Sequence, residues 1–347
     1  MTVVIDPVTG LPEFGAGDDL AAAIAAHASV AAGDIVVVTS KVISKVQGLR
    51  RPATERELAI AEHTKRVVAE RAGAHGPTRV VEAVAGPVMA AAGVDASSTG
   101  ETGTVLLLPA DPDHAARELH TALASALDLA PDRFGVIISD TAGRPWRHGL
   151  SDFAIGASGV RTLLDHRGET DEDGHTLAVT VRAVADELAA AADLVKGKGA
   201  GVPVAIVRGA QAWLGPGSAR ELVRSGPSDW FALGPVEAVR GALGVAPGSP
   251  ASERIGLPSL GGSPFAERVT RALDLALADL DAWGDAQALG ADVEIAAEVA
   301  HIALTCPDEY LLGVAAARLA VAEAAEDLHG KHDRHPGGHR VTLRPRS

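Results

Sequence analysis

The stretch Val136-Ile137-Ile138-Ser139-Asp140-Thr141-Ala142-Gly143-Arg144-Pro145-Trp146-Arg147 joins a short apolar run to a dense polar group. The apolar run predicts a buried strand, because a strand that is covered on both faces needs no polar alternation. In α/β folds, ligands are usually held just beyond the ends of strands. Here a carboxylate beside a hydroxyl suits a hard divalent cation, and two guanidinium groups suit a phosphate or a carboxylate. Taken alone, the stretch is equally compatible with a strand followed by a solvated turn that contains proline.

The chain around this stretch alternates apolar runs with amphipathic segments. Strands are predicted at Ile35 to Val38, Val105 to Leu108 and Pro203 to Val207. A helix that starts at Asp111-Pro112 leads into the central strand, and this order indicates a parallel crossover unit. A capping-box pattern at Thr54 predicts another helix, which runs to about Gly73. The pattern therefore predicts an α/β protein with mixed sheets.

The last hundred residues have a different composition. Residues 1–243 are interpreted as one domain, and residues 244–265, rich in Gly, Pro and Ser, as a linker. Residues 266–330 are predicted to be a helical appendage, with one of its helices over about Val293 to Leu304. The histidine-containing tail, 331–347, is predicted to be disordered, with opportunistic metal binding as the alternative.

Composition limits the kind of partner. The 347 residues carry a formal charge of −14, which argues against broad nucleic-acid binding. The sequence shows no apolar run typical of a membrane span and no export signal at its amino terminus, so we expect a cytoplasmic protein without membrane contact. Cys306 is the single cysteine, so no intramolecular disulfide can form. An anionic substrate would need local positive charge or metal ions.

Further residues resemble an anion site. Lys41 and Lys45 follow a predicted strand end together with Ser40; the alternative is a surface edge strand with alternating lysines. A second lysine-glycine segment, Lys196 to Gly201, comes before a strand, so it is not a dinucleotide fingerprint. Its glycines let the backbone approach an anion closely, and its lysines supply charge.

Six motifs occur in one order along the chain. They are Gly-Leu-Pro-Glu-Phe (10–14), Thr-Ser-Lys-x3-Lys (39–45), Gly-Val-Asp-x-Ser (93–97), Ile-Ser-Asp-Thr-x-Gly-Arg-Pro-Trp-Arg (138–147), Ala-Asp-Glu-Leu-Ala (185–189) and Pro-Val-x-x-Val-Arg-Gly (203–209). The set resembles the coenzyme F420-0:L-glutamate ligase family over about residues 8–243. The resemblance implies a two-lobed fold, an intertwined homodimer, and GTP-dependent addition of L-glutamate to the deazaflavin cofactor precursor F420-0.

The resemblance also implies roles for individual residues. Asp95 and Asp140 match ligands of a first divalent metal, Mg²⁺ or Mn²⁺, and Thr141 matches a ligand of a second; K⁺ is a further candidate ion. Ser98 stands where the family usually has an asparagine that contacts the nucleotide. Lys198 stands where the family can have a glutamine or glutamate that binds the second metal, and an ammonium group cannot do so. The positions that match the GTP site are Leu11, Pro12, Glu13, Phe14, Ser40, Lys41, Lys45 and Lys198.

The implied chemistry is phosphorylation of the acceptor carboxylate by GTP, followed by attack of glutamate on the acyl phosphate. Phosphoryl transfer depends mainly on positioning and charge neutralisation. Asp140, Arg144 and Arg147 are the candidate catalytic residues, and the two arginines, Lys45 and Lys198 are candidates for holding phosphates or the glutamyl tail. The carboxy-terminal segment is too short for a flavin domain, so no flavin is expected. The alternatives are a regulatory homologue without activity and a ligase for another amino acid or acceptor.

Overall fold

The computed structural model describes residues 2–346 and divides into two compact units. Unit 1 contains the chain up to Lys65 and Val81–Ser228; unit 2 contains Arg66–Val80 and the chain from Asp229 onward. Both units combine helices with sheets, so the predicted α/β class is confirmed. None of the helices within residues 2–346 is long and apolar enough to cross a membrane.

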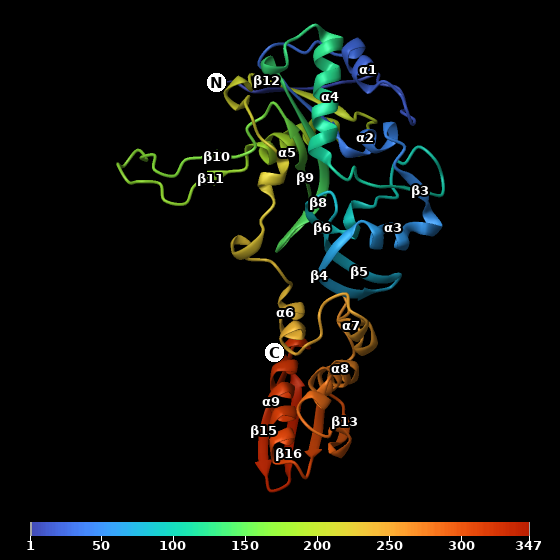
Figure 1. The fold of residues 1–347 in the computed structure, drawn as a ribbon, viewed down its shortest axis with the longest axis vertical. Coiled ribbons are helices and arrows are strands. Elements are labelled where there is room, and N and C mark those ends of the chain that lie inside the picture. Colours follow the sequence, from blue (N-terminus) through green and yellow to red (C-terminus); the bar gives the residue numbers. More distant parts are fainter. Residues whose placement is uncertain (1, 347) are drawn as a thin grey trace. The chain divides into compact units, whose positions relative to one another are not determined.

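Unit 1 is built on a five-stranded mixed sheet with the order β1-β12-β2-β8-β9 (Figure 1). β2 and β8 run parallel and place Thr39 opposite Ser139. The residues that follow, Ser40 and Asp140, therefore lie side by side where β2 ends, while β8 continues in its pairing with β9. The strands are β1 (Val4–Pro7), β2 (Ile35–Thr39), β8 (Gly135–Arg144), β9 (Arg147–Ser158) and β12 (Val204–Arg208).

Helices cover both faces of this sheet (Figure 1). On one face, Ile35 and Val37 of β2 share a buried cluster with Leu188 of α5 (Val184–Lys196). On the other face α4 (Pro112–Leu127) lies against β8 and β9 and contacts α1 (Leu20–His27). A side chain at Gly156 of β9 would collide with the Pro112 carbonyl, so glycine permits this close approach.

The remaining elements of unit 1 are short, and several border the candidate site. α2 (Ser40–Val46) continues directly from β2, so the alternative of an edge strand at the lysines is wrong, because this segment is a helix. The hairpin of β10 (Leu164–Asp165) and β11 (Val181–Arg182) extends into solvent (Figure 1). The others are β3 (Arg50–Pro52), α3 (Arg56–Glu62), β6 (Val88–Ala90) and β7 (Thr104–Leu106).

The boundary between the units is crossed by a pair of strands, β4 (Thr64–Gly73) and β5 (Gly76–Ala83). The helix predicted from Thr54 to about Gly73 is therefore wrong beyond α3, which ends at Glu62. The sequence of β4 alternates exposed or half-buried residues with buried Val68 and Glu70, which is a strand pattern.

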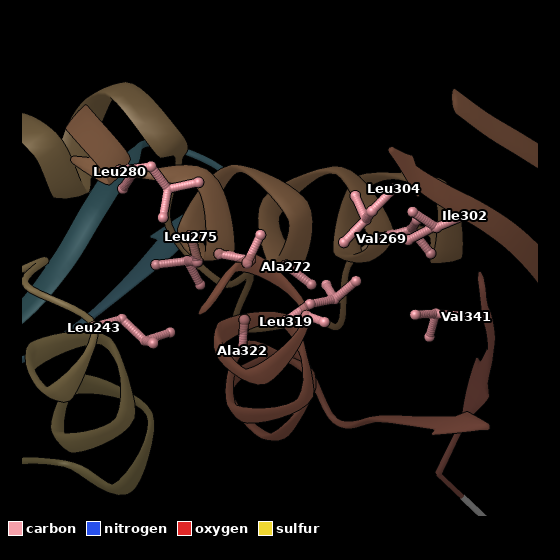
Figure 2. Packing of buried hydrophobic residues seen from close by; sticks show 14 of the residues in the cluster. Leu243, Val269, Ala272, Leu275, Leu280, Ile302, Leu304, Leu319, Ala322 and Val341 are labelled. Carbon is pink, nitrogen blue, oxygen red and sulfur yellow. The ribbon is translucent and has the colours of Figure 1, made fainter. Parts of the chain in front are cut away.

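Unit 2 has an antiparallel sheet of its own, with the order β13-β14-β16-β15, packed against two helices. Figure 2 shows Val269 and Leu275 of one helix and Leu319 of the other lying with Ile302 and Val341 of the sheet in one apolar core. The elements are α6 (Pro235–Ala242), α7 (Pro250–Ile255), α8 (Phe265–Leu277), β13 (Gly290–Ala296), β14 (Val299–Thr305), α9 (Glu309–Ala325), β15 (Leu328–His335) and β16 (Gly338–Pro345).

This architecture corrects three expectations for the carboxy-terminal region. The helix predicted over about 293–304 is the β13–β14 hairpin, so the region 266–330 is not simply helical. The tail 331–347, predicted to be disordered, forms most of β15 and β16 over its described residues, because Val341 and Leu343 alternate into the core. Residues 244–265 are not a linker, since they contain α7 and bury Val245 fully.

A buried ionic network connects β4 and β5 to the rest of unit 2. Glu237 on α6 accepts hydrogen bonds from the Glu70 amide, at 3.0 Å, and from the Arg71 side chain. Glu70 in turn accepts from Arg79 and from Ser252 on α7. Carboxylates that are removed from water require such partners, so segment 66–80 belongs structurally to unit 2.

Candidate active site

Asp140 and Ser40 lie at the point where β8 and β2 leave the parallel pair. The Ser40 hydroxyl donates to Asp140 Oδ1 at 2.8 Å. A register shift between Ile138 and Ser139 in the β8–β9 pairing marks a bulge next to the acid. The extra residue is Ile155 of β9, which lies across from the residues just before Asp140, and bulges of this kind are common beside active sites.

Asp95 reaches the same place from another loop. Asp95, Asp140, Ser40 and Lys41 line one small, partly open cavity of about 10 Å³. A cavity of this size holds about one water-sized particle. Lys41 Nζ lies 2.5 Å from Asp95 Oδ2 and also contacts Ser97. The structure thus brings together the two acids that the sequence named as ligands of the first metal.

Asp152 on β9 forms a second polar group beside the first. Asp152 lies opposite Thr141, and its Oδ1 accepts a hydrogen bond from Thr141 Oγ1 at 2.5 Å. The same carboxylate accepts from Ser139 at 2.9 Å and from Lys196 Nζ at 2.8 Å. Both members of the Asp152–Lys196 pair are 3% exposed. A buried ion pair with this many hydrogen bonds holds the β8–β9 hairpin to the end of α5.

The two buried aspartates differ in their electrostatics. Burial, with a smaller contribution from the nearby Asp152 and Asp95 carboxylates, raises the pKa of Asp140 to about 6, although the hydrogen bond from Ser40 lowers it. Burial also raises the pKa of Asp152, but the charge and hydrogen bonds of Lys196 outweigh it and leave the pKa below its usual value. At Asp95, burial is likewise outweighed, by hydrogen bonds from Lys41 and Ser97, so this pKa is also lowered. Asp140 is thus the carboxylate whose charge is least compensated.

Lys198 occupies the neighbourhood of Thr141. Its Nζ donates to Thr141 Oγ1 at 2.5 Å, while the same hydroxyl donates to Asp152. The Thr141 hydroxyl therefore keeps one lone pair for a metal ion, and the ammonium group of Lys198 already lies beside it. Neither Thr141 nor Lys198 lines the cavity that Asp95 shares with Asp140.

The residues predicted to contact the nucleotide lie around this centre. Lys45, which is buried, pairs with the exposed Glu13. A side chain on Gly100 would touch both Glu13 and Lys45, so the loops at 10–14 and 95–101 converge on α2. Phe14 is buried, whereas Leu11 is half-buried and Pro12 exposed. Ser98 is exposed in the loop after Asp95, with a φ of +52°.

Arg144 and Arg147 are not brought to the carboxylates. They face each other across the exposed β8–β9 turn, and Arg144 donates to the His148 carbonyl at 3.3 Å. Neither arginine lines the cavity. Their proposed contact with phosphates or with a glutamyl tail stays a prediction.

Asp152 and the pairing role of Lys196 were missed by the sequence reasoning. The available signal was an acid directly before the apolar run Phe153-Ala154-Ile155, because an acid that is buried with such a run requires a partner. Folding the chain back at Pro145-Trp146 would have placed residue 152 near Thr141. The partner on α5 has no local signal in the sequence.

The donor sets differ in their fit to metal ions. Asp95 and Asp140 supply carboxylate oxygens around a space for one particle, which suits a hard divalent ion. Thr141 has a hydroxyl already shared by Asp152 and an ammonium group, and this set does not suit a second divalent ion. The residues therefore fit one resident ion better than two.

The fold and the site define a class: an α/β protein in which desolvated aspartates meet several lysines at the ends of neighbouring strands. Residues 10–209 match the family model described as F420-0:Gamma-glutamyl ligase. The chain belongs to this family, and it is a ligase.

Curated relatives agree with this assignment. The chain is similar to the coenzyme F420:L-glutamate ligase of Archaeoglobus fulgidus, with 41% identity over 244 residues, covering 66% of this chain and 96% of the relative. It is also 41% identical over 224 residues to the protein of the same name from Halobacterium salinarum, covering 58% of this chain and 85% of the relative. The Methanopyrus kandleri protein of that name is 40% identical over 250 residues, covering 66% and 98%.

Proposed function

We propose that the chain joins L-glutamate to coenzyme F420-0, using GTP to activate the acceptor carboxylate as an acyl phosphate. Three named relatives and the family match support the substrate class. The observation that carries the proposal is the cavity shared by Asp95 and Asp140, because phosphoryl transfer requires a cation at the phosphates. Addition of further γ-linked glutamates is compatible with the same chemistry.

The protein's own groups would supply binding and orientation. Asp95 and Asp140 would hold one Mg²⁺ or Mn²⁺, which when bound neutralises charge on the transferring phosphate. Lys41 and Lys45 lie beside this position and could exchange their present carboxylate partners for phosphate oxygens. Lys198 would supply, at Thr141, a fixed positive charge in place of a second divalent ion.

Lys196 and Asp152 would orient the site without contacting the substrate. Both are buried, and their hydrogen bonds fix Ser139 and Thr141 on either side of Asp140. Positioning within a fraction of an ångström matters for in-line transfer, because misplacement of the reacting atoms lowers the rate steeply. Asp152 and Lys196 are thus positioning residues in this proposal.

The assay follows from the chemistry. F420-0 is incubated with GTP, L-glutamate and Mn²⁺, and the product mass is measured; hydroxylamine added in place of glutamate should trap the acyl phosphate as a hydroxamate. We expect one added glutamate and GDP as the nucleotide product. Product with ATP but not GTP would overturn the nucleotide assignment, and product only with another amino acid would favour the alternative ligase. No product with any acceptor would favour the regulatory homologue.

The assembly is proposed to be a homodimer. The support in the described residues is the β10–β11 hairpin, which extends into solvent and leaves Val179 85% exposed. Exposed apolar groups on extended arms are typical of interaction surfaces. Light scattering after size exclusion should give twice the chain mass, and a monomer at micromolar concentration would contradict this part of the proposal.

A further inference from the structure

Unit 2 contains two histidines whose ring nitrogens meet at the spacing of a shared ligand. His332 Nδ1 on β15 lies 3.0 Å from His339 Nε2 on β16. Two nitrogens bound to one metal at about 2.0–2.1 Å are themselves separated by about 3.3 Å in tetrahedral geometry. To bind one ion, the two nitrogens must separate by only a few tenths of an ångström, and each ring must rotate by about 35° so that both lone pairs converge on the metal.

A buried carboxylate fixes the orientation of the first imidazole. Glu323 on α9, whose side chain is 7% exposed, lies 2.8 Å from His332 Nε2. When His332 Nε2–H donates a hydrogen bond to Glu323, Nδ1 of His332 keeps a lone pair, which is directed toward His339. Carboxylate–histidine pairs of this kind hold metal-binding histidines in the required tautomer.

The backbone of β15 makes room for this carboxylate. A side chain at Gly330 would lie within 2.7 Å of three atoms of the Glu323 carboxyl group. β15 pairs with β16 through this position, where glycine otherwise weakens a strand. The absent side chain is thus explained by the position of Glu323, an observation independent of the distance between the imidazoles.

The histidine pair opens onto a cavity. Leu312, Gly313, Ala316 and Ala320 of α9 line a space of about 330 Å³ together with His332 and His339. Small residues on the helix keep the space beside the two rings free. Coordination positions that the protein leaves vacant would face this cavity and could take water or a small anionic ligand.

We propose that His332 and His339 form a binding site for a borderline transition-metal ion such as Zn²⁺, with Glu323 as the orienting carboxylate. The ion is bound by His332 Nδ1 and His339 Nε2, and the proton now shared between them moves to Nδ1 of His339. The oxygen-rich centre at Asp95 and Asp140 suits harder ions, so the two sites select different metals.

Zn²⁺ titration of the full chain by calorimetry tests the proposal. The protein is stripped of metal and kept in excess Mg²⁺, which occupies oxygen-ligand sites. All proteins carry His175→Gln, because Asp171, Asp173 and His175 at the exposed hairpin tip could also hold an ion. One Zn²⁺ per chain is expected, and Co²⁺ should show the visible absorption of nitrogen ligation.

Matched variants separate this site from unspecific binding. His332→Gln and His339→Gln should abolish stoichiometric binding, and Glu323→Gln should weaken it by about 10- to 100-fold. His329→Gln, an exposed histidine on the same strand, should leave the affinity unchanged. Circular dichroism checks that each variant is folded. If a variant is unfolded, its titration is replaced by a measurement on the parent protein, in which Zn²⁺ should protect His332 and His339 from modification by diethylpyrocarbonate.

Two results would overturn the proposal. The first is the absence of Zn²⁺ binding under these conditions, which would reduce the histidine pair to a structural hydrogen bond. The second is stoichiometric binding that persists in a folded His332→Gln/His339→Gln protein. Neither result bears on ligation of glutamate, because the measurement does not involve F420-0 or GTP.

Discussion

Asp140, half-buried, and Asp152, buried, are acids on one hairpin, yet only Asp152 has a cation of its own. The charge left uncompensated at Asp140 is what a divalent ion would neutralise. Buried charge without a partner is costly, and its retention at a site of this kind indicates a functional requirement.

Replacing Asp140 tests this requirement. Asp140→Asn should lower glutamate-dependent GDP release by about a thousandfold or more, because the ion that stabilises the transferring phosphate is lost. The variant should unfold at no lower urea concentration than the parent protein, since a desolvated charge is removed. Asp132→Asn, at an exposed position, is the matched control. Near-normal turnover of Asp140→Asn would show that the metal assignment is wrong.

In the proposed mechanism, Lys198 determines how many divalent metal ions the active site binds. With a non-hydrolysable GTP analogue, Lys198→Gln should bind one Mn²⁺ more per chain than the parent protein, because the ammonium group leaves Thr141 and an amide oxygen takes its place. Free Mn²⁺ measured by electron paramagnetic resonance gives the count, and Lys331→Gln is an exposed control. An unchanged count would mean that Lys198 does not occupy a cation position.

At the scale of elements, the ion pair between Lys196 and Asp152 joins the end of α5 to the β8–β9 hairpin. Lys196→Met should destabilise the protein by about 3–5 kcal/mol, because Asp152 is left buried and unpaired. Adding Asp152→Asn should recover most of that stability without restoring ligation. Urea denaturation measures the free energy of unfolding of both variants. If Lys196→Met alone were as stable as the parent protein, the ion pair would not be buried in solution.

α4 carries the clearest pH-sensitive contact outside the site. Burial lowers the pKa of His120, which lies against Phe134 and contacts Ser158 at 2.8 Å. As pH falls below about 6.5, His120 therefore takes up a proton in the unfolded chain before it does so in the folded protein. The contribution of neutral His120 to the free energy of unfolding is complete above that pH and decreases below it. Urea midpoints at pH 8.0 and 5.5 should differ less in His120→Gln than in the parent protein. An equal difference would contradict the buried, neutral state.

The sequence could predict elements where their pattern is local. The strand after Gly135 and the helix after Asp111 were both recognisable, and the ordered motifs placed Asp95, Asp140 and Lys41 in one region. Asp152 could not be paired with Lys196, because their contact spans 44 residues and depends on the packing of α5. The helix expected near residue 293 was wrong. A short apolar run fits the periodicity of a helix and that of a strand equally well, and here the pairing of β13 with β14 made it a strand.

At the scale of the whole molecule, the family match covers residues 10–209, which include Arg66–Val80 of unit 2 but not the larger part of unit 2 from Asp229 onward. A chain ended after Leu243, the boundary predicted from the sequence, would lose most of unit 2 while keeping Arg66–Val80. We expect such a chain to bind the dye ANS and to aggregate, because Val236, Val239 and Leu243 lose the apolar core against which they pack, and buried Glu70 loses its hydrogen bond from Ser252. A monodisperse truncated protein with full ligase activity would contradict this expectation.

Because unit 2 combines Arg66–Val80, from the first quarter of the chain, with the chain from Asp229 onward, its parts leave the ribosome at very different times. The early strands must wait for α6 and α7 before Glu70 and Arg71 meet Glu237 and Ser252. During that interval the nascent chain carries an incomplete β-hairpin that can pair wrongly with other chains. Production of the protein should therefore benefit from slow synthesis and from chaperones that shield early strands.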